Sequence, residues 1–133
     1  KRVVHQGMIT KDGAKMSKST GNVVDPDNYD PRALRMYLMF IGPYTEGGDW
    51  NDRAIGGVEK FLRRFQEWMS KEGDGTIDID AFEAQLEKDT MAMKFNKVVS
   101  GFMILLKENK DRALTKEQRE RLTNLLNIYA PVK

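Results

Sequence analysis

The sequence lacks several residue types that particular chemistries require. None of its 133 residues is cysteine, so disulfides and thiolate metal sites are excluded. Its single histidine, His5, excludes a histidine-rich zinc cluster and gives little support to a Ser-His-Asp triad. No apolar run approaches the ~18 residues of a membrane span, and no signal-peptide pattern is present. We therefore expect a cytoplasmic protein without membrane contact.

Charge of one sign is not in large excess either. The formal net charge is +2, which is too small to indicate nucleic-acid binding by itself. Hydrophobic residues make up 40% of the chain, enough for a packed core in one domain or in two small units that share one. Because the chain starts at Lys1 without an initiator methionine and stops abruptly at Lys133, we expect it to be a piece of a longer protein.

The most informative stretch is the pentapeptide KMSKS at residues 15–19, which continues into Gly21 and Asn22. It places two lysines and two hydroxyls within five residues. Lysine carries a compact charge on a long stem, serine hydroxyls can donate to phosphate oxygens, and Gly21 allows a positive φ. The pattern predicts a phosphate-binding loop, which we call the KMSKS loop (residues 15–22). A solvated Lys/Ser loop without a ligand is the alternative.

The rest of the chain predicts a mainly α fold. Residues 3–9 read as a strand, and Asp12-Gly13 is a tight-turn signal that closes a short β-hairpin before the KMSKS loop. Residues 44–49 read as a loop. Apolar residues then recur at threes and fours, which predicts amphipathic helices joined by short links. We expect the hairpin and loop to lead into an antiparallel helical bundle.

Side chains that can accept the free amides of a first turn mark the predicted helix starts. Asp30 is followed by Pro31, and Asp80 and Thr115 each stand three residues before Glu83 or Gln118, as in a capping box. The predicted N-caps, in chain order, are Asp30, Asn51, Asp80, Asn96 and Thr115. The predicted ends lie at Gly42-Pro43, after Met69, near Met93, near Asn109 and before Pro131.

The KMSKS loop resembles the signature loop of class I aminoacyl-tRNA synthetases, and its flanks resemble leucyl-tRNA synthetases in particular. The resemblance is close over about residues 3–68 and weaker beyond. It rests on the following stretches: QGM at 6–8, KDGA at 11–14, GNVV at 21–24, ALRMYLMF at 33–40, GP at 42–43 and DWND at 49–52, with MKFN at 93–96 and YAP at 129–131 farther on.

The resemblance implies a domain organisation. In such enzymes a Rossmann-type catalytic domain comes first, the signature loop closes it, and a helical anticodon-binding domain follows. Residues 1–50 would then be the C-terminal end of the catalytic domain, with the KMSKS loop and the stem-contact region. Residues 51–133 would be a truncated anticodon-binding helical bundle.

The resemblance also implies a reaction. The family activates leucine with ATP, releases pyrophosphate and transfers leucine to tRNA(Leu). Lys18 matches the catalytic lysine that meets the ATP phosphates in the transition state, and Lys15, Ser17 and Ser19 complete the expected ATP-binding set. No metal site is evident, so Mg²⁺ would arrive with ATP. The family's other ATP signature and the amino-acid pocket are absent, and we predict that the isolated chain is inactive.

Four cations are candidates for tRNA contact, although a solvated helix face is the commoner explanation for each of them: Arg35, Lys60, Arg63 and Arg64. Arg32 stands where the family usually has an acid. Two other readings of the chain stay open. One is an RNA-binding helical module without a catalytic role; the other is the same region of a valyl-, isoleucyl- or methionyl-tRNA synthetase.

Overall fold

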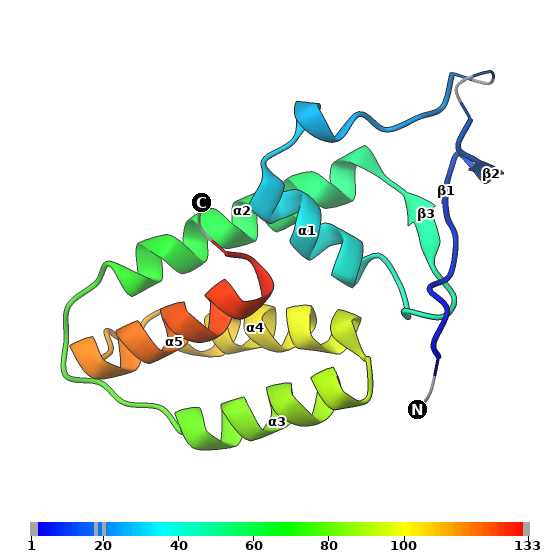
Figure 1. The fold of residues 1–133 in the computed structure, drawn as a ribbon. Helices are drawn as coiled ribbons and strands as arrows, with labels where there is room; N and C mark the ends of the chain where they lie inside the picture. The colour runs from blue at the N-terminus through cyan, green and yellow to red at the C-terminus, as the bar shows by residue number, and fades with distance from the viewer. Residues whose placement is uncertain (1–2, 18, 20, 132–133) are drawn as a thin grey trace.

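The computed structural model describes residues 3–17, 19 and 21–131, and it places a small sheet at one end of a helical body (Figure 1). This confirms the predicted mainly α fold with a short hairpin. The elements in chain order are β1 (Ile9–Lys11), β2 (Ala14–Lys15), the 3-10 helix η1 (Pro26–Asn28), α1 (Pro31–Phe40), β3 (Gly48–Trp50), α2 (Asp52–Met69), α3 (Ile79–Met91), α4 (Phe95–Asn109) and α5 (Lys116–Tyr129).

The sheet has the order β2-β1-β3. β1 and β2 are antiparallel, with Thr10 opposite Lys15, and the turn between them places Asp12 at φ 54° and Gly13 at φ 76°. Two consecutive left-handed residues are what a two-residue hairpin turn requires, so the predicted turn is confirmed. β3 pairs in parallel with β1, with Thr10 opposite Asp49.

The strand predicted over residues 3–9 is wrong in extent, because only Ile9 belongs to β1. Residues 43–48, which turn at Pro43, lie beside residues 3–8. Two backbone hydrogen bonds join the two segments: Gly7 N donates to Tyr44 O, and Gly48 N donates to Met8 O. A strand needs a continuous ladder partner, which these isolated bonds do not provide. The loop predicted for residues 44–49 is also corrected, since its last two residues begin β3.

The four helices α2 to α5 run in alternating directions, as predicted for an antiparallel bundle (Figure 1). α1 packs against both α2 and α4. Its buried residues, Ala33, Met36 and Tyr37, belong to the same apolar cluster as those of the four following helices. The predicted domain boundary at residue 50 stays a prediction, while the core on its two sides is continuous.

A chain of edge-to-face aromatic pairs crosses the centre of this core. Phe102 on α4 is fully buried, and its ring centroid lies 6.0 Å from that of Phe65 on α2, 5.1 Å from Phe82 on α3 and 6.0 Å from Tyr129 on α5. Such pairs add roughly 0.5–1.5 kcal/mol beyond their area burial. Phe102 therefore joins all four bundle helices.

Three of the predicted N-caps are confirmed. The side chain of Asp30 accepts from Arg32 N at 3.1 Å, and that of Asn51 accepts from Arg53 N at 2.8 Å. The hydroxyl of Thr115 accepts from an amide in the first turn of α5 at 3.3 Å. These caps act on amides two or three residues away, which is why sequence spacing alone locates them.

Two predicted caps are wrong, and the first is that of α3. This helix begins earlier than expected, because Asp78 rather than Asp80 accepts from Ala81 N, at 3.0 Å. Asp80 and Glu83 instead bind Arg121 on α5, with 2.6 Å between Arg121 Nη2 and Glu83 Oε2. Asp80 and Glu83, which the sequence predicts as a capping box, therefore connect α3 to α5.

The second wrong cap is that of α4. The helix begins at Phe95, after Lys94, so Asn96 lies inside the helix and does not cap it. Lys94 makes no side-chain cap hydrogen bond. The start of α4 is set instead by the preceding turn, in which Met93 has φ 58° and Lys94 N donates to Asp89 O at 2.8 Å.

The link between α2 and α3 is held against the link between α4 and α5. Gly75 N donates to Ala113 O at 2.8 Å, and Thr115 N donates to Gly75 O at 3.0 Å. The indole of Trp68, at the end of α2, donates to Arg112 O at 2.8 Å. The α2–α3 link and the α4–α5 link, both polar in sequence, are therefore hydrogen-bonded to each other through their backbones. They lie at the end of the bundle away from the sheet (Figure 1).

Arg32 connects the first helix to the last. Its Nε donates to Ala130 O at 2.7 Å, and its Nη2 donates to Asn127 Oδ1 at 3.4 Å. Ala130 is the C-cap of α5, where carbonyl groups lack helical partners and a cation is favoured. Arg32 thus has a structural role in this chain, because it joins α1 to the C-terminal end of α5.

Candidate functional site

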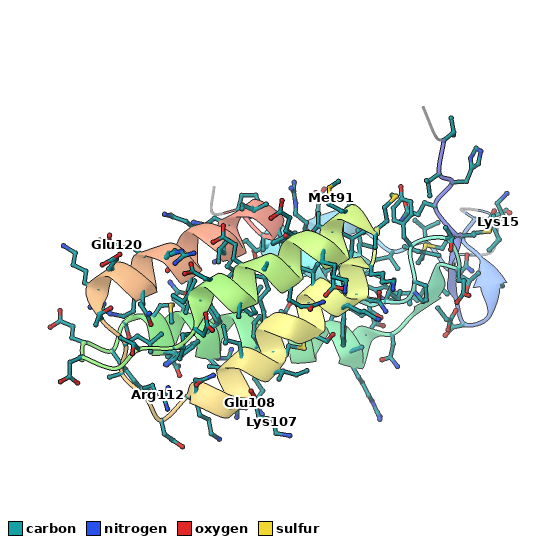
Figure 2. All side chains as sticks on the ribbon, turned by 90° about the horizontal axis from the view of Figure 1, so that it is seen from below. Lys15, Met91, Lys107, Glu108, Arg112 and Glu120 are labelled. Atoms are coloured by element: carbon teal, nitrogen blue, oxygen red, sulfur yellow. The ribbon has the colours of Figure 1, made fainter. Side chains whose placement is uncertain are left out.

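The hairpin carries the KMSKS loop at one end of the molecule. β2 ends at Lys15, so the loop leaves directly from the sheet edge. Figure 2 shows Lys15 at the end opposite the C-terminal end of α4, where Lys107 is labelled. Lys15 is exposed, so its long cationic side chain is accessible at this end of the molecule.

The side chain of Asn22 joins the two ends of the loop. Its Oδ1 accepts from Ser17 N at 2.8 Å, and its Nδ2 lies 3.1 Å from Lys15 O, 3.4 Å from Lys11 O and 3.5 Å from Ala14 O. One amide therefore contacts both the hairpin and the start of the loop. Gly21, which precedes Asn22, makes a second hydrogen bond that closes the loop, because its N donates to Ser17 O at 3.1 Å. Its φ is 70°, the positive φ that the sequence predicts for this glycine.

Two of the expected ATP-binding residues, Ser17 and Ser19, contact each other. The hydroxyls of Ser17 and Ser19 are 2.8 Å apart, and Ser19 N donates to Ser17 Oγ at 3.3 Å. A phosphate oxygen could exchange with this internal bond, because each hydroxyl can rotate toward a new acceptor. Lys18, the predicted catalytic lysine, lies outside the described residues.

Asp49 fastens the hairpin to β3. Its Oδ1 accepts from Thr10 Oγ1 at 2.6 Å and from Gly13 N at 3.0 Å. These two hydrogen bonds, the one from Thr10 foremost, favour the ionised form and hold the pKa of the Asp49 carboxyl below its ordinary value. The carboxylate thus fixes the turn from which the loop departs.

Asp52 makes the corresponding connection to the helical body. Its Oδ1 accepts from Trp50 Nε1 at 2.7 Å and from Tyr29 OH at 2.8 Å. The two bonds lower the pKa of Asp52, the Trp50 bond contributing most, and the bond to Asp52 raises the pKa of Tyr29. The stretch DWND thus anchors the sheet (Asp49), the core (Trp50), the start of α2 (Asn51) and the segment before α1 (Asp52).

Sequence reasoning identified the loop but not the residues that hold it. Asn22 entered the sequence analysis as a member of the loop without a role, and Asp49 only as part of a family pattern. A signal for Asn22 was available, since asparagine after a glycine commonly bonds nearby backbone groups. Asp49 offered no local signal, because its partners are 36 and 39 residues away.

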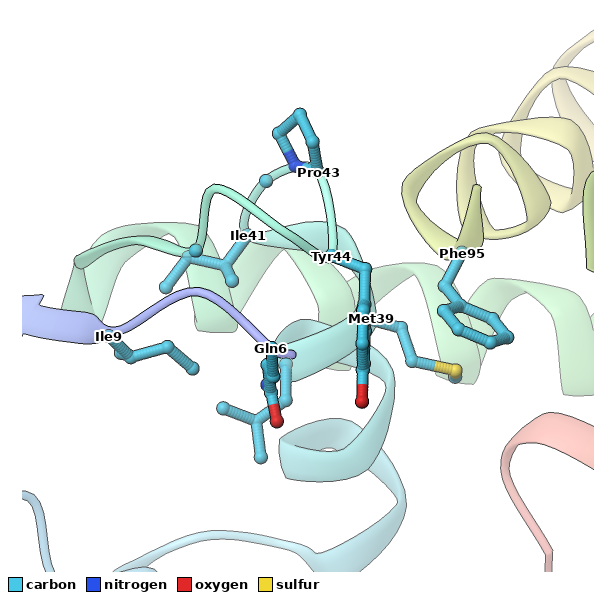
Figure 3. Close-up of a pocket in the computed structure, with 10 residues that line it drawn as sticks. Gln6, Ile9, Met39, Ile41, Pro43, Tyr44 and Phe95 are labelled. Atoms are coloured by element: carbon cyan, nitrogen blue, oxygen red, sulfur yellow. The ribbon is translucent and has the colours of Figure 1, made fainter. Parts of the chain in front are cut away.

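A small apolar pocket lies between the segment before β1 and the end of α1 (Figure 3). Its volume is about 170 Å³, and Phe95 at the start of α4 closes one side, with its ring centroid 5.8 Å from that of Tyr44. None of the described residues that line it is charged. It is therefore unsuited to phosphate, and it does not compete with the KMSKS loop as an ATP-phosphate site. The lining residues labelled in Figure 3 are Gln6, Ile9, Met39, Ile41, Pro43, Tyr44 and Phe95.

The four candidate tRNA-binding cations are not brought together as one set. Lys60 and Arg64 on α2 line a second groove, which runs between α2 and α4. Arg63 is exposed on the same helix but does not line that groove, and Arg35 is exposed on α1. Their role in RNA contact stays a prediction.

Metal-ligating clusters and membrane-spanning helices are both missing from residues 3–17, 19 and 21–131. No group of three or more histidine, cysteine or acidic side chains in these ranges could hold a metal ion. No helix in the same part of the chain combines the length and the apolar character needed to cross a membrane.

Comparison with known proteins agrees with the loop and its setting. The family model described as "tRNA synthetases class I (M)" matches residues 1–61, from the segment before β1 into α2. The chain belongs to the class I tRNA synthetases. The match contains every anchoring residue described above around the KMSKS loop.

Several leucine–tRNA ligases are similar over more of the chain. That of Pseudothermotoga lettingae is 42% identical over 126 residues, covering 80% of this chain and 16% of the relative. That of Thermotoga maritima is 33% identical over 161 residues, which cover 95% of this chain and 20% of the relative. That of Chlorobaculum parvum is 35% identical over 149 residues, which cover 98% of this chain and 18% of the relative. The synthetase chain thus spans a fifth or less of the length of these relatives.

Proposed function

We propose that this synthetase chain is the part of a leucine–tRNA ligase that supplies the ATP-phosphate loop and tRNA-binding helices. The observation that carries the proposal is the KMSKS loop held on a hairpin by Asn22 and Asp49. The similarity to leucine–tRNA ligases beyond residue 61, where the family match ends, supports the choice of leucine.

The chemistry asked of these residues is positioning and charge neutralisation. In amino-acid activation the substrate carboxylate attacks the α-phosphorus of ATP and pyrophosphate leaves, so no general base on the protein is needed. Negative charge grows on the phosphate oxygens as the bond breaks. Lys15 and Lys18 would place ammonium groups against that charge, while Ser17 and Ser19 donate hydrogen bonds.

The partners follow from this role. ATP and leucine would bind with the help of parts of the enzyme outside this chain, and tRNA(Leu) would lie along the helices. Mg²⁺ would enter as part of the ATP substrate, with its oxygen ligands supplied mainly by the phosphates. The protein would act in the cytoplasm.

The amino acid is tested by ATP–pyrophosphate exchange with the full-length protein, using leucine, isoleucine, valine and methionine separately. We expect exchange with leucine alone. Exchange with one of the other three would keep the mechanism and change the amino acid. No exchange from a folded full-length protein would contradict the enzymatic role and favour an RNA-binding module. The isolated chain is expected to give no exchange.

Asn22 is expected to be a positioning residue in this reaction. Replacing Asn22 with alanine in the full-length protein removes the bonds between the hairpin and Ser17 N. Misplacing a reacting group by about 1 Å can cost ~100-fold in rate, so we expect kcat for exchange to fall about 10- to 100-fold. The KM for leucine should stay unchanged, because the amino-acid pocket is elsewhere.

Asn28→Ala is the matched control for this experiment. Asn28 is an exposed asparagine of η1, and its side chain makes no hydrogen bond within the described residues. This variant should retain full exchange. An Asn22→Ala protein with unchanged kcat, or one whose reduced rate is explained by a lower melting temperature, would show that the amide does not position the loop.

A further inference from the structure

Met16, the second residue of the KMSKS pentapeptide, attaches the KMSKS loop to the apolar core. Its side chain is half-buried and packs against the core cluster, whereas Lys15 before it is exposed. Val24 makes the corresponding attachment after the loop. Among the described residues from 15 to 25, these are the two hydrophobic side chains that pack against the core, since Val23 is 46% exposed. Met16 is therefore the apolar anchor at the start of the loop.

The hydrogen bonds that close the loop lie on both sides of Met16. The side chain of Asn22 holds Ser17 N through Oδ1 at 2.8 Å and Lys15 O through Nδ2 at 3.1 Å. Gly21 N adds a bond to Ser17 O at 3.1 Å. Because Lys15 and Ser17 are the chain neighbours of Met16, a shift of Met16 away from the core displaces both groups that Asn22 holds.

The eight methionines of the chain differ in how far solvent can reach them, and Met16 is the one within the KMSKS loop. Met8 and Met91 are 59% and 78% exposed, whereas Met36 is fully buried. The four remaining methionines are half-buried and lie in or beside helices: Met39, Met69, Met93 and Met103. Met16 is also half-buried, so part of its side chain is accessible to a small solute while the rest contributes apolar packing.

We propose that Met16 is an oxidation site through which peroxide detaches the KMSKS loop from the core and stops leucine-dependent ATP–pyrophosphate exchange. The proposal rests on the proposed function of the chain, and it adds a regulation of the same loop. The thioether sulfur attacks one oxygen of hydrogen peroxide, so an S–O bond forms as the O–O bond breaks. The sulfur is oxidised to the sulfoxide, and the peroxide is reduced to water, which takes the proton of the transferred oxygen.

The added oxygen weakens the attachment of Met16 to the core. Methionine packs there as a flexible apolar side chain, whereas its sulfoxide is polar. A polar group in an apolar contact is unfavourable without a hydrogen-bond partner, and water is close because the side chain is already partly exposed. The sulfoxide therefore turns outward, and the backbone of Lys15 and Ser17 moves with it. A displacement of about 1 Å can cost ~100-fold in rate, so we expect exchange to fall about 10- to 100-fold.

The test is peroxide treatment of the full-length protein, followed by leucine-dependent exchange and by mass spectrometry of the peptides that contain the methionines. A thiol reductant added after treatment reverses the oxidation of any cysteine outside this chain. We expect Met8 and Met91 to be oxidised first, Met16 next and Met36 last, because oxidation follows exposure. Exchange should fall in step with Met16 sulfoxide, and methionine sulfoxide reductases for both epimers should restore it.

Two variants of Met16 separate its oxidation from other damage, and each protein is compared with its own untreated rate. Leucine cannot form a sulfoxide and has a similar volume, so Met16→Leu should keep more than about half of its rate where wild type loses about 90%. Met16→Gln introduces a polar side chain without an oxidant. Its kcat should be about 10-fold below that of Met16→Leu, with the KM for leucine unchanged, because the loop and not the amino-acid pocket is displaced.

Met8→Leu is the matched control, since it removes an exposed methionine outside the loop and should lose exchange on treatment as wild type does. The proposal is overturned if exchange survives complete conversion of Met16 to the sulfoxide, or if Met16→Leu loses as much exchange as wild type. It is also overturned if Met16 resists peroxide as fully as the buried Met36 does.

A failure of the proposed function gives a different pattern, because the untreated wild-type enzyme then shows no exchange. Deuterium uptake by residues 15–22 of the same full-length protein still tests the anchor. Ser17 N and Gly21 N are hydrogen-bonded, so their uptake should be about 10-fold faster after oxidation of wild type and unchanged in treated Met16→Leu. Faster uptake in an inactive protein would reject the enzymatic role alone. Leucine-dependent exchange that persists with Met16 oxidised would reject the anchor alone.

Discussion

Replacing Lys18 with alanine in the full-length protein is expected to lower leucine-dependent ATP–pyrophosphate exchange about 100- to 1000-fold. This is the usual reduction when one group that stabilises developing negative charge is removed from an enzyme, and it corresponds to roughly 3–4 kcal/mol of barrier. Steady-state exchange over a range of ATP concentrations measures it. The fall should be in kcat more than in the KM for ATP, because the charge is greatest in the transition state.

The loss of exchange should depend on which lysine is removed and on the shape of the cation that replaces it. Lys88→Ala, on the exposed face of α3, is the control and should exchange at the wild-type rate. Lys18→Arg should recover only part of the activity, since a planar guanidinium does not replace a compact ammonium. If Lys18→Ala retained more than about a tenth of the wild-type kcat, the lysine would not have the role that the family resemblance assigns to it.

Replacing Phe102 with alanine is expected to destabilise the chain by about 3–5 kcal/mol, as is usual for a large buried aromatic residue. Phe102 is fully buried and contacts rings from α2, α3 and α5, so the cavity would open where all four bundle helices meet. Since small domains have only about 5–15 kcal/mol of stability, the variant should be close to unfolding. Urea denaturation followed by circular dichroism measures the change.

Ile104→Ala supplies the comparison on the same helix. Ile104 is 53% exposed, so its truncation should change the free energy of unfolding by no more than about 0.5 kcal/mol. A Phe102→Ala protein destabilised by less than about 1.5 kcal/mol would mean that the neighbouring helices collapse into the space. The four-helix junction would then be less tightly determined than its ring contacts indicate.

Features that depend on neighbouring residues could be located from the sequence. The Asp12-Gly13 turn and the caps at Asp30, Asn51 and Thr115 were all predicted, and each acts within two or three residues along the chain. Helix existence was also predictable, because apolar periodicity is a local pattern. The residue types of the KMSKS loop predicted a phosphate-binding loop, and the family resemblance supplied ATP as its expected ligand.

Features that depend on distant partners were not predicted. β3 exists because it lies beside β1, and its own three residues carry no strand signal. Asp80 and Glu83 read as a cap but bind Arg121, 41 and 38 residues away, and Asp78 takes the capping role. Tertiary contacts, which local sequence does not show, decided that residues 48–50 form a strand and that Asp80 binds another helix instead of capping its own.

The contact between Arg32 and the end of α5 sets an order of events during synthesis. Arg32 Nε and Ala130 O are separated by 98 residues. At ribosomal speeds of about 5–20 residues per second, the guanidinium waits roughly 5–20 s for its acceptor. Through that interval α1 lacks its hydrogen-bond partner at the end of α5, although α2 and α4, against which it packs, are synthesised earlier. The hairpin that carries the KMSKS loop is therefore synthesised early, whereas the helical body beside it is completed late.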